Sequence, residues 1–198
     1  MPEIRDISDH QRLGLLDLRK FGADRGISSG RECETLGTRF LVEKLLNGAP
    51  CNILYTQFRK PYLEGRNEKI SVSHSHDRLA VLLNTREETG VDIELLREKV
   101  LNIRHKFLSE SEQRFAGDHI ENLISLWAAK EAMYKAYGRK QLDFSRHLTV
   151  EPFKGDDLYG TLDTGKVRHD YAMRRERLGE YILVYILHEI PVAKGQAT

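Results

Sequence analysis

Apolar and polar residues alternate along the chain in patterns that predict helices and strands in two successive blocks. In the first block, apolar residues recur at helical spacing in residues 10–21 and 31–48, and the second of these helices should end at Asn47-Gly48. Strand patterns follow in the segments "NILYTQF", "KISVSHS", "DRLAVLL" and "TGVDIE". Because only short polar stretches separate the last three, we expect them to form an antiparallel meander.

The second block repeats this order loosely. Helical patterns cover residues 98–117 and 120–138, and strand patterns follow in "HLTVEPF", "LYGTLD", "KVRHDYAM" and "EYILVYILHEI". Residue types typical of turns occur at Asp163-Thr164-Gly165 and at Leu178-Gly179. No Pro- or Gly-rich linker separates the blocks, so we predict an α+β fold with an N-terminal half, 1–94, and a C-terminal half, 95–198, packed as one globular unit.

Composition and charge narrow the class of protein. The chain has 198 residues, of which 40% are hydrophobic and 31% charged, and its net charge is +1, as in an ordinary globular protein. No apolar run approaches the roughly 20 residues of a membrane span, and the first residues, "MPEIRDISDH", carry no apolar stretch of the kind found in signal peptides. We therefore expect a cytoplasmic monomer that binds neither nucleic acid nor membranes. Cys33 and Cys51 fit neither a metal-ligand spacing nor a disulfide framework, and we expect both to be small buried hydrophobic residues.

The strand "TGVDIE" carries two carboxylates beside apolar residues. Strand alternation places Val91 and Ile93 on one face and Gly90, Asp92 and Glu94 on the other. Two like charges on one face are unfavourable unless that face is solvated or holds a cation, and hard oxygen ligands suit Mg²⁺ together with phosphate oxygens. Gly90 would let another backbone or a ligand approach. The alternative is a solvated face of an edge strand.

The helix expected at 120–138 carries charges within its apolar stripe. Leu126, Trp127 and Met133 belong to this stripe, and Lys130 falls near its middle, so the ammonium group must reach solvent or meet an anion. Glu131 and Lys135 are spaced i,i+4 on the edge of the stripe, where a surface ion pair is the simplest interpretation. That pair would not explain Lys130.

A third polar pattern lies in "KISVSHSHD". Alternation places His74 with Ile70 and Val72 on one face of the strand, and the serines on the other. A histidine on an apolar face is usually a hydrogen-bonded core residue. Beside carboxylates and lysines, His74 is a candidate hydrogen-bond donor to a phosphate group. His76 and Asp77 are expected to form the hairpin turn.

The segments "GVDIE" at 90–94 and "WAAKEAMYK" at 127–135 resemble, in order and spacing, the paired signatures of the 4'-phosphopantetheinyl transferases. They are most similar to the Sfp-like type, in which two halves lie in one chain. The segments "KPYL" at 60–63, "SHS" at 73–75 and "FLSESE" at 107–112 also resemble family elements. The resemblance covers residues 58 to 138. His76 departs from the family, which often has Gly after "SHS".

This resemblance implies two similar α/β halves related by a pseudo-twofold axis, with coenzyme A bound in the cleft between them. It implies that Asp92, Glu94 and Glu131 are ligands of Mg²⁺, with Mn²⁺ as a possible substitute. The residues that match the family's coenzyme A contacts are Lys60, with the "FRKP" loop that would hold the adenine, Ser73, His74, Lys130 and Lys135. Arg31 and Arg39 are the nearest candidates for holding the 3'-phosphate.

The resemblance also implies the reaction. A serine of an apo acyl or peptidyl carrier protein would attack the β-phosphate of coenzyme A, and 3',5'-ADP would leave. The implied catalytic residues are Glu131, Lys135 and Asp92, and the base would be Glu131 or a metal-bound water that it orients. Two alternatives are another metal-dependent phosphoryl enzyme and a non-catalytic coenzyme A binder, although the sequence has no Walker-type Gly-rich loop or HD-type His pair.

The stretch "LLREKVLNIRHKF", residues 95–107, mixes basic and apolar side chains directly after the carboxylate strand. Such a mixture suits docking of an acidic amphipathic helix, and carrier proteins present one beside their modified serine. The alternative is an amphipathic helix with a solvated basic face. The position next to Glu94 favours docking, with Arg97 and Arg104 as candidate contacts.

Overall fold

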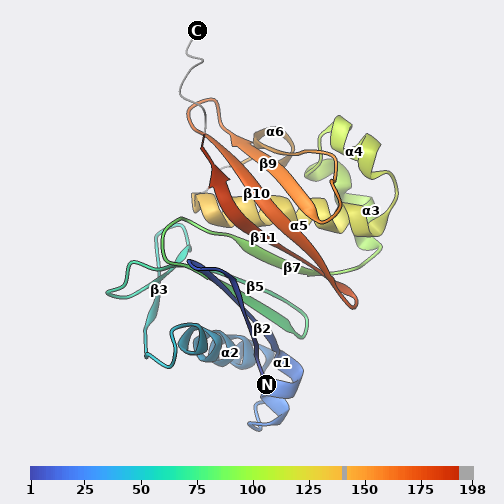
Figure 1. Ribbon diagram of the computed structural model, residues 1–198. Helices are drawn as coiled ribbons and strands as arrows, with labels where there is room; N and C mark the ends of the chain where they lie inside the picture. The colour runs from blue at the N-terminus through green and yellow to red at the C-terminus, as the bar shows by residue number, and fades with distance from the viewer. Residues whose placement is uncertain (140–141, 192–198) are drawn as a thin grey trace.

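In the computed structural model, which describes residues 1–139 and 142–191, two antiparallel sheets lie face to face and helices cover their outer faces (Figure 1). The first sheet has the strand order β1 (Glu3–Ser8), β2 (Gln11–Asp17), β6 (Arg78–Asn84), β5 (Lys69–Ser75), β4 (Pro61–Leu63) and β3 (Ile53–Tyr55). The second has the order β7 (Val91–Leu95), β11 (Tyr181–Ile190), β10 (Arg168–Leu178), β9 (Asp157–Asp163) and β8 (Leu148–Val150).

The helices divide between the two sheets. The first sheet carries α1 (Leu18–Ala23) and α2 (Gly30–Leu45). The remaining helices belong with the second sheet: α3 (Lys99–Ile103), the 3₁₀ turn η1 (Arg104–Lys106), α4 (Glu110–Ala116), α5 (Ile120–Tyr137) and α6 (Phe144–His147). None of the helices in the described ranges is long and apolar enough to cross a membrane.

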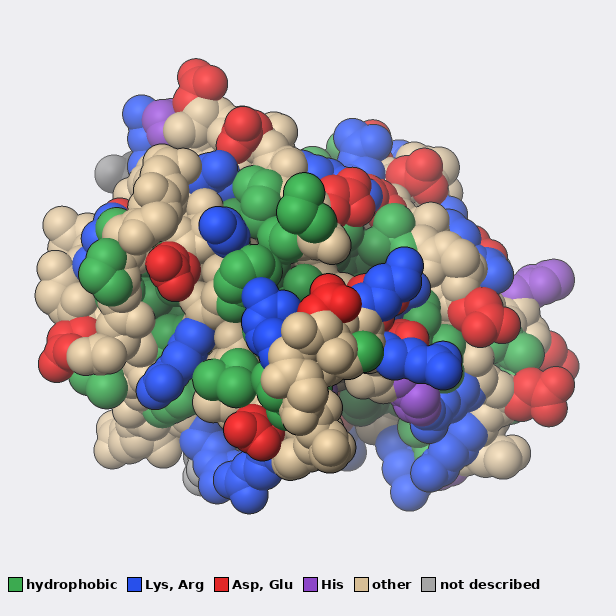
Figure 2. Space-filling model, turned by 90° about the horizontal axis from the view of Figure 1, so that it is seen from below, with side chains coloured by type: hydrophobic (Ala, Val, Ile, Leu, Met, Phe, Trp, Pro, Cys, Tyr) green, Lys and Arg blue, Asp and Glu red, His purple; other side chains and the backbone are tan. Residues whose placement is uncertain are grey.

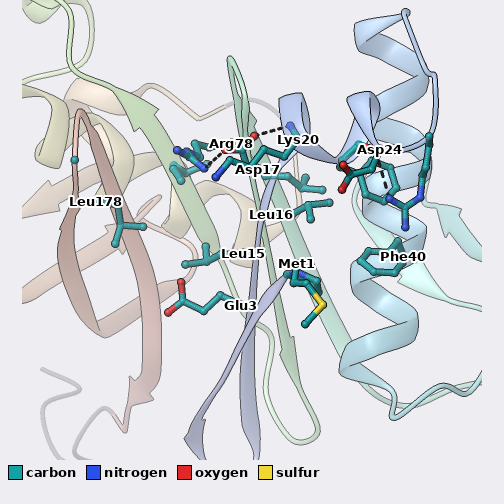
Figure 3. A pocket seen from close by; sticks show the side chains of 16 residues that line it. Met1, Glu3, Leu15, Leu16, Asp17, Lys20, Asp24, Phe40, Arg78 and Leu178 are labelled. Carbon is teal, nitrogen blue, oxygen red and sulfur yellow. Dashed lines mark hydrogen bonds and ion pairs between the residues drawn. The ribbon is translucent and has the colours of Figure 1, made fainter.

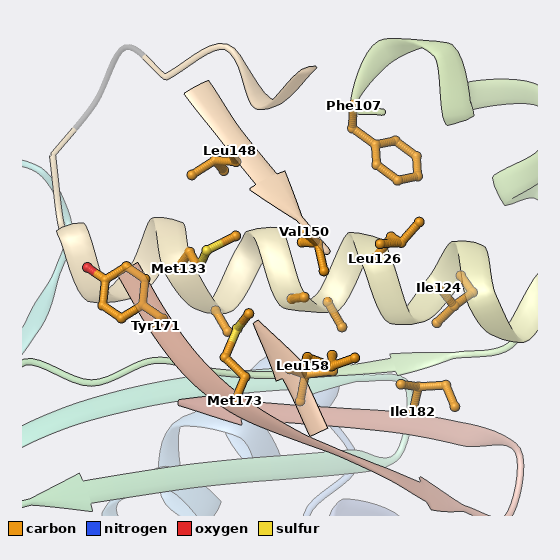
Figure 4. Close-up of a cluster of buried hydrophobic side chains, with 14 of the residues drawn as sticks. Phe107, Ile124, Leu126, Met133, Leu148, Val150, Leu158, Tyr171, Met173 and Ile182 are labelled. Atoms are coloured by element: carbon orange, nitrogen blue, oxygen red, sulfur yellow. The ribbon is translucent and has the colours of Figure 1, made fainter. Parts of the chain in front are cut away.

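Three buried clusters hold the layers together. Helix α2 packs on the first sheet through residues such as Leu41. Leu82 and Val91 belong to the cluster between the two sheets. Figure 4 shows the third cluster, in which α5 lies on the second sheet and buries side chains such as Met133, which lies near Met173 of β10. The α+β prediction is confirmed, and the pseudo-twofold relation between the halves stays a prediction.

The helix predicted over residues 10–21 is wrong in its first part. Residues Gln11–Asp17 form β2, and α1 begins only at Leu18, where the Asp17 side chain caps it by accepting from the amide of Lys20 at 2.9 Å. Strand β2 is buried on both faces, because Leu13 faces the second sheet and Leu16 faces α2. A strand covered on both sides loses its alternation and resembles a helix in its pattern of apolar residues.

The predicted meander is wrong in its third strand. Strands β5 and β6 form the expected hairpin, but β7 pairs with β11 in the other sheet. The chain therefore changes sheets between β6 and β7. The division at residue 94 stays a prediction, and the end of the predicted second half, residues 192–198, lies outside the described residues.

Other expectations agree with the structure. Helices α2 and α5 and strands β8 to β11 occupy the predicted segments, with left-handed residues at the predicted stops Asn47 and Gly138. Cys33 is buried as expected, whereas Cys51 is only partly buried. On the face drawn in Figure 2, basic and acidic side chains are interspersed.

Candidate active site

Strand β7 presents its two carboxylates toward helix α5. Val91 and Ile93 pack between the sheets, so Asp92 and Glu94 lie on the opposite face, as the alternation predicts. A Cβ atom at Gly90 would lie 1.9 Å from the carbonyl oxygen of Ala132 in α5. The glycine therefore admits another backbone, as predicted, and brings the helix close enough for its side chains to reach β7.

Asp92 is the most buried acid of this group, with 3% of its surface exposed. Its Oδ1 atom accepts hydrogen bonds from Lys135 Nζ and from Ser73 Oγ, each at 2.7 Å. Lys135 Nζ also donates to the carbonyl oxygen of Val91 at 3.1 Å. Asp92 Oδ2 is buried and has no hydrogen-bond partner among the described residues. An orphaned carboxylate oxygen of this kind is suited to a hard cation.

Glu94 lies one step along the same face. Its Oε1 accepts from the indole of Trp127 at 3.0 Å and its Oε2 accepts from Ser75 Oγ at 3.2 Å. Burial raises the pKa of Glu94, and the negative charge of Asp92 raises it further. Both hydrogen bonds oppose this shift, so the carboxylate is held in place in an unfavourable environment.

Glu131 faces the same carboxylates from α5. Burial raises its pKa to about 7, the charges of Asp92 and Glu94 add to the shift, and Lys135 opposes it. Lys135 forms its ion pair with Asp92 across the two elements, not the helix-surface pair with Glu131 that the i,i+4 spacing suggests. Asp92, Glu94 and Glu131 therefore repel one another electrostatically, and Lys135 compensates only part of their charge.

The structure does not contain a ready-made metal centre. Within residues 1–139 and 142–191, no group of three or more His, Cys, Asp or Glu side chains has the arrangement of a metal site. Asp92, Glu94 and Glu131 interact electrostatically, but Oδ1 of Asp92 already accepts a hydrogen bond from Lys135. Metal binding by these three acids therefore stays a prediction.

Lys130 does not reach this site. Its side chain is fully buried, and Nζ donates to Glu112 Oε2 at 2.7 Å, to the Phe107 carbonyl at 2.8 Å and to the Phe144 carbonyl at 3.0 Å. The predicted need for an anion is thus met by Glu112 within the protein. All three ammonium protons have partners, so the structure corrects the expectation that Lys130 contacts coenzyme A.

The "FRKP" loop meets the C-terminal end of α5. Lys60 Nζ donates to the carbonyl oxygen of Ala136 and pairs with Glu88, and its stem lies against Gly138, where any Cβ atom would collide with it. A small cavity of about 140 Å³ is lined by the loop and by Lys135, among others. Two segments predicted to bind coenzyme A are therefore adjacent.

The other predicted contacts lie outside this group. His74 points away from the carboxylates toward α2, where its Nδ1 atom is 3.5 Å from Glu34, and its side chain is 49% exposed rather than buried in a core. Arg31 and Arg39 are exposed on α2. Their contacts with a phosphate stay predictions. His76 forms the hairpin turn as expected, with a positive φ of 52°.

Many side chains of the basic stretch at 95–107 make contacts within the protein. Val100 and Phe107 are buried in the cluster beneath α5, and the other apolar side chains of α3 pack against it. Arg104 donates to Asp118 and to the carbonyl oxygen of Gly117. Arg97 and Lys99 remain exposed. The apolar component of the predicted docking face is therefore used internally, as in the alternative of an amphipathic helix.

A larger cavity of about 590 Å³ lies elsewhere (Figure 3). Ile93 contributes to its lining, and because this side chain points away from Asp92, the cavity is on the opposite side of β7 from the carboxylates. Asp17 and Arg78 form an ion pair of 2.9 Å in its wall. The acids that define the candidate site take no part in it.

Sequence reasoning missed several partners in the site. Glu112 was not recognised as the counter-ion of Lys130, nor Trp127 and Ser75 as donors to Glu94. The serine alternation in "SVSHS" was visible, but nothing in the sequence indicated that these serines face β7.

Comparison with known proteins places the chain beside one family. The family model ACPS, described as the 4'-phosphopantetheinyl transferase superfamily, matches residues 88–186. The matched part contains both β7 and α5, with the three acids and Lys135, whereas strands β1 to β6 precede it. No curated protein matches the chain.

Proposed function

Because the chain belongs to the 4'-phosphopantetheinyl transferase superfamily, we propose that it is a single-chain, Sfp-like enzyme that acts on a carrier protein. It would transfer the 4'-phosphopantetheine arm of coenzyme A to a serine of an apo acyl or peptidyl carrier protein. Both halves of the site would come from one chain, so the enzyme would act as a monomer. The presence of two stacked sheets, each with a long helix on its outer face, supports this arrangement.

The observation that carries the proposal is the convergence of Asp92, Glu94, Glu131 and Lys135 where β7 meets α5. Asp92, Glu94 and Glu131 would hold Mg²⁺, or Mn²⁺ in its place. The orphaned Oδ2 atom of Asp92 and the mutual repulsion of the acids fit a hard dication. When bound, the ion would neutralise charge on the coenzyme A pyrophosphate.

Coenzyme A would lie along the junction of the two halves. The cavity beside Lys135 and the "FRKP" loop would take the adenine end, with Lys60 at its edge. Lys135 would then face the pyrophosphate with the ammonium proton that is not donated to Asp92 or Val91. His74, Arg31 and Arg39 are proposed for the remaining phosphate groups.

In the proposed reaction, the serine oxygen forms a bond to the β-phosphorus of coenzyme A, and the bond from that phosphorus to the oxygen bridging to the α-phosphate breaks. 3',5'-ADP leaves with the bonding electrons, and Lys135 would stabilise the developing negative charge. The serine proton would pass to a carboxylate oxygen of Glu131. The chain thus contributes mainly orientation and charge compensation, which phosphoryl transfer requires.

Incubation of the protein with apo carrier protein, coenzyme A and Mg²⁺, followed by intact-mass measurement of the carrier, tests the proposal. A mass gain equal to one phosphopantetheine arm is expected, and it should disappear with EDTA. Coenzyme A hydrolysis without carrier modification would identify a different phosphoryl enzyme. A coenzyme A-dependent rise in melting temperature without any reaction would identify a non-catalytic binder.

A further inference from the structure

Three serines of β5 lie in a row along the free edge of β7. One edge of β7 pairs with β11, and on the other edge the amides of Val91, Ile93 and Leu95 point toward β5. These amides donate to the hydroxyl oxygens of Ser71 at 3.0 Å, Ser73 at 3.3 Å and Ser75 at 3.3 Å. Side-chain oxygens thus take the place of the carbonyl groups that a neighbouring strand would provide.

The direction of these hydrogen bonds determines what else each hydroxyl can do. A serine hydroxyl has one proton, so an oxygen that accepts from a backbone amide still donates once. Ser73 donates its proton to Asp92 Oδ1 at 2.7 Å, and Ser75 donates to Glu94 Oε2 at 3.2 Å. Among the hydrogen bonds of the described residues, Ser71 makes only the backbone contact.

Burial makes the Ser73 contact geometrically well defined. Ser73 is 6% exposed and Asp92 is 3% exposed, so water does not compete for their hydrogen bond. Ser73 and Lys135 both hold Oδ1, which leaves the second oxygen of Asp92 without a partner. Because Ser73 is fixed to the backbone amide of Ile93, it ties the carboxylate orientation to the strand itself.

We propose that Ser73 and Ser75 are positioning residues that orient the carboxylates of Asp92 and Glu94 toward the divalent cation, while the hydroxyl of Ser71 is bonded to a backbone amide and to neither carboxylate. The inference rests on the proposed function. It replaces the expected direct contact of Ser73 with coenzyme A, because the single hydroxyl proton is already donated to Asp92. Residues that orient metal ligands affect metal affinity without touching the metal.

The test compares Ser73→Ala and Ser75→Ala with the matched control Ser71→Ala. Each variant removes one acceptor from a β7 amide, so similar losses of thermal stability are expected. Mn²⁺ affinity, measured by electron paramagnetic resonance with neither coenzyme A nor carrier protein present, should fall roughly 10- to 100-fold in Ser73→Ala. Ser75→Ala should show a smaller loss in the same direction, and Ser71→Ala should stay within about twofold of wild type because it touches no carboxylate.

Two further measurements separate positioning from structure and from substrate binding. Ser73→Thr keeps the hydroxyl and should restore most of the Mn²⁺ affinity. At saturating Mn²⁺, Ser73→Ala should lower kcat for carrier modification and leave KM for coenzyme A unchanged. Equal Mn²⁺ affinity in the Ser73 and Ser71 variants would overturn the inference, as would a raised KM for coenzyme A with unchanged Mn²⁺ affinity. A wild-type protein that neither modifies carrier nor binds Mn²⁺ would overturn the proposed function and this inference together.

Discussion

Lys135 in α5 and Asp92 in β7 form an ion pair of 2.7 Å that joins the central helix to the first strand of the second sheet. The carboxylate is almost fully buried, whereas a quarter of the Lys135 side chain is exposed. The pair therefore reaches from the interior to an accessible surface. In the proposed function, a phosphate of coenzyme A would approach the lysine from this exposed side.

Replacing Asp92 by Asn should nearly abolish transfer without unfolding the protein. Asn keeps the shape of the side chain, and removing one charge from the crowded acids relieves Glu94 and Glu131. We expect the rate of carrier modification to fall by at least about 100-fold, because loss of a proposed ligand should cost more than the roughly 10- to 100-fold typical of residues that only orient ligands. Metal-free melting temperatures are the control, and a decrease of many degrees would mean that Asp92 is structural.

Coenzyme A should raise the melting temperature of the wild-type protein, and Lys135→Ala should reduce this rise more than Arg39→Ala. Lys135 faces the candidate site from α5, whereas Arg39 is exposed on α2 and was chosen only from its position in the sequence. Each tenfold loss of affinity removes about 1.4 kcal/mol of ligand stabilisation. Thermal shift titrations with coenzyme A measure both variants. Equal losses would show that the two residues contribute alike, contrary to this ranking.

Ionisation of Glu131 should destabilise the metal-free protein as the pH rises. The pKa of this group is raised from 4.5 to about 7 in the folded state, so between these values the folded protein binds more protons than the unfolded chain. Stability then falls with increasing pH across this window; the cost is absent below 4.5 and complete above 7. Burial of Glu94 acts in the same direction.

The variant Glu131→Gln tests this dependence because it cannot ionise. Its melting temperature in EDTA should exceed that of wild type at pH 8, and the difference should vanish as the pH approaches the ordinary range of a glutamate. The exposed Glu98→Gln provides a control for the charge change. Parallel curves for wild type and Glu131→Gln between pH 5 and pH 8 would contradict the assignment.

Lys130 should matter for stability rather than for coenzyme A binding. Its ion pair with Glu112 is fully buried, and Lys130→Met would leave the Glu112 charge without its cation. Breaking such a pair typically costs roughly 3–5 kcal/mol of unfolding free energy. Urea unfolding should show this loss, and adding Glu112→Gln should recover part of it. If Lys130→Met kept its stability but lost coenzyme A binding, Lys130 would instead contact coenzyme A directly.

The side chains that share a face of β7 or of α5 could be predicted, because they depend on local periodicity. Alternation alone places Asp92 opposite Val91, and the glycine at position 90 indicates a close approach. The family resemblance brought Glu131 and Lys135 to the same site, and the structure agrees in placing Lys135 beside Asp92.

What could not be predicted depends on packing between distant segments. Lys130 meets Glu112 because α4 begins beside α5, and the serines of β5 meet β7 because the two sheets stack. Neither relation leaves a periodic signal in the sequence. Strand β2 was mistaken for a helix for a related reason, since burial on both faces removes the alternation that identifies a strand.

The carrier protein should dock beside the carboxylates through the exposed basic side chains just before and at the start of α3. Arg104 is held by Asp118 and is a poor choice for this role, whereas Arg97 and Lys99 are exposed directly after β7. Exposed charges mainly affect association, and salt screens them with a Debye length of roughly 8 Å at physiological ionic strength. The double reversal Arg97→Glu with Lys99→Glu should therefore raise KM for the carrier severalfold and flatten the salt dependence of the rate.

Coenzyme A affinity should not change in this double variant, because neither side chain lies near Lys60 or the cavity beside Lys135. The matched control is Lys154→Glu with Lys166→Glu, which makes the same charge change on turns of β8–β9 and β9–β10. Steady-state kinetics with apo carrier protein at low and high salt compare the two. If both double variants keep wild-type carrier kinetics at low salt, the basic residues of α3 are only solvated, and the carrier must approach Glu94 from another side.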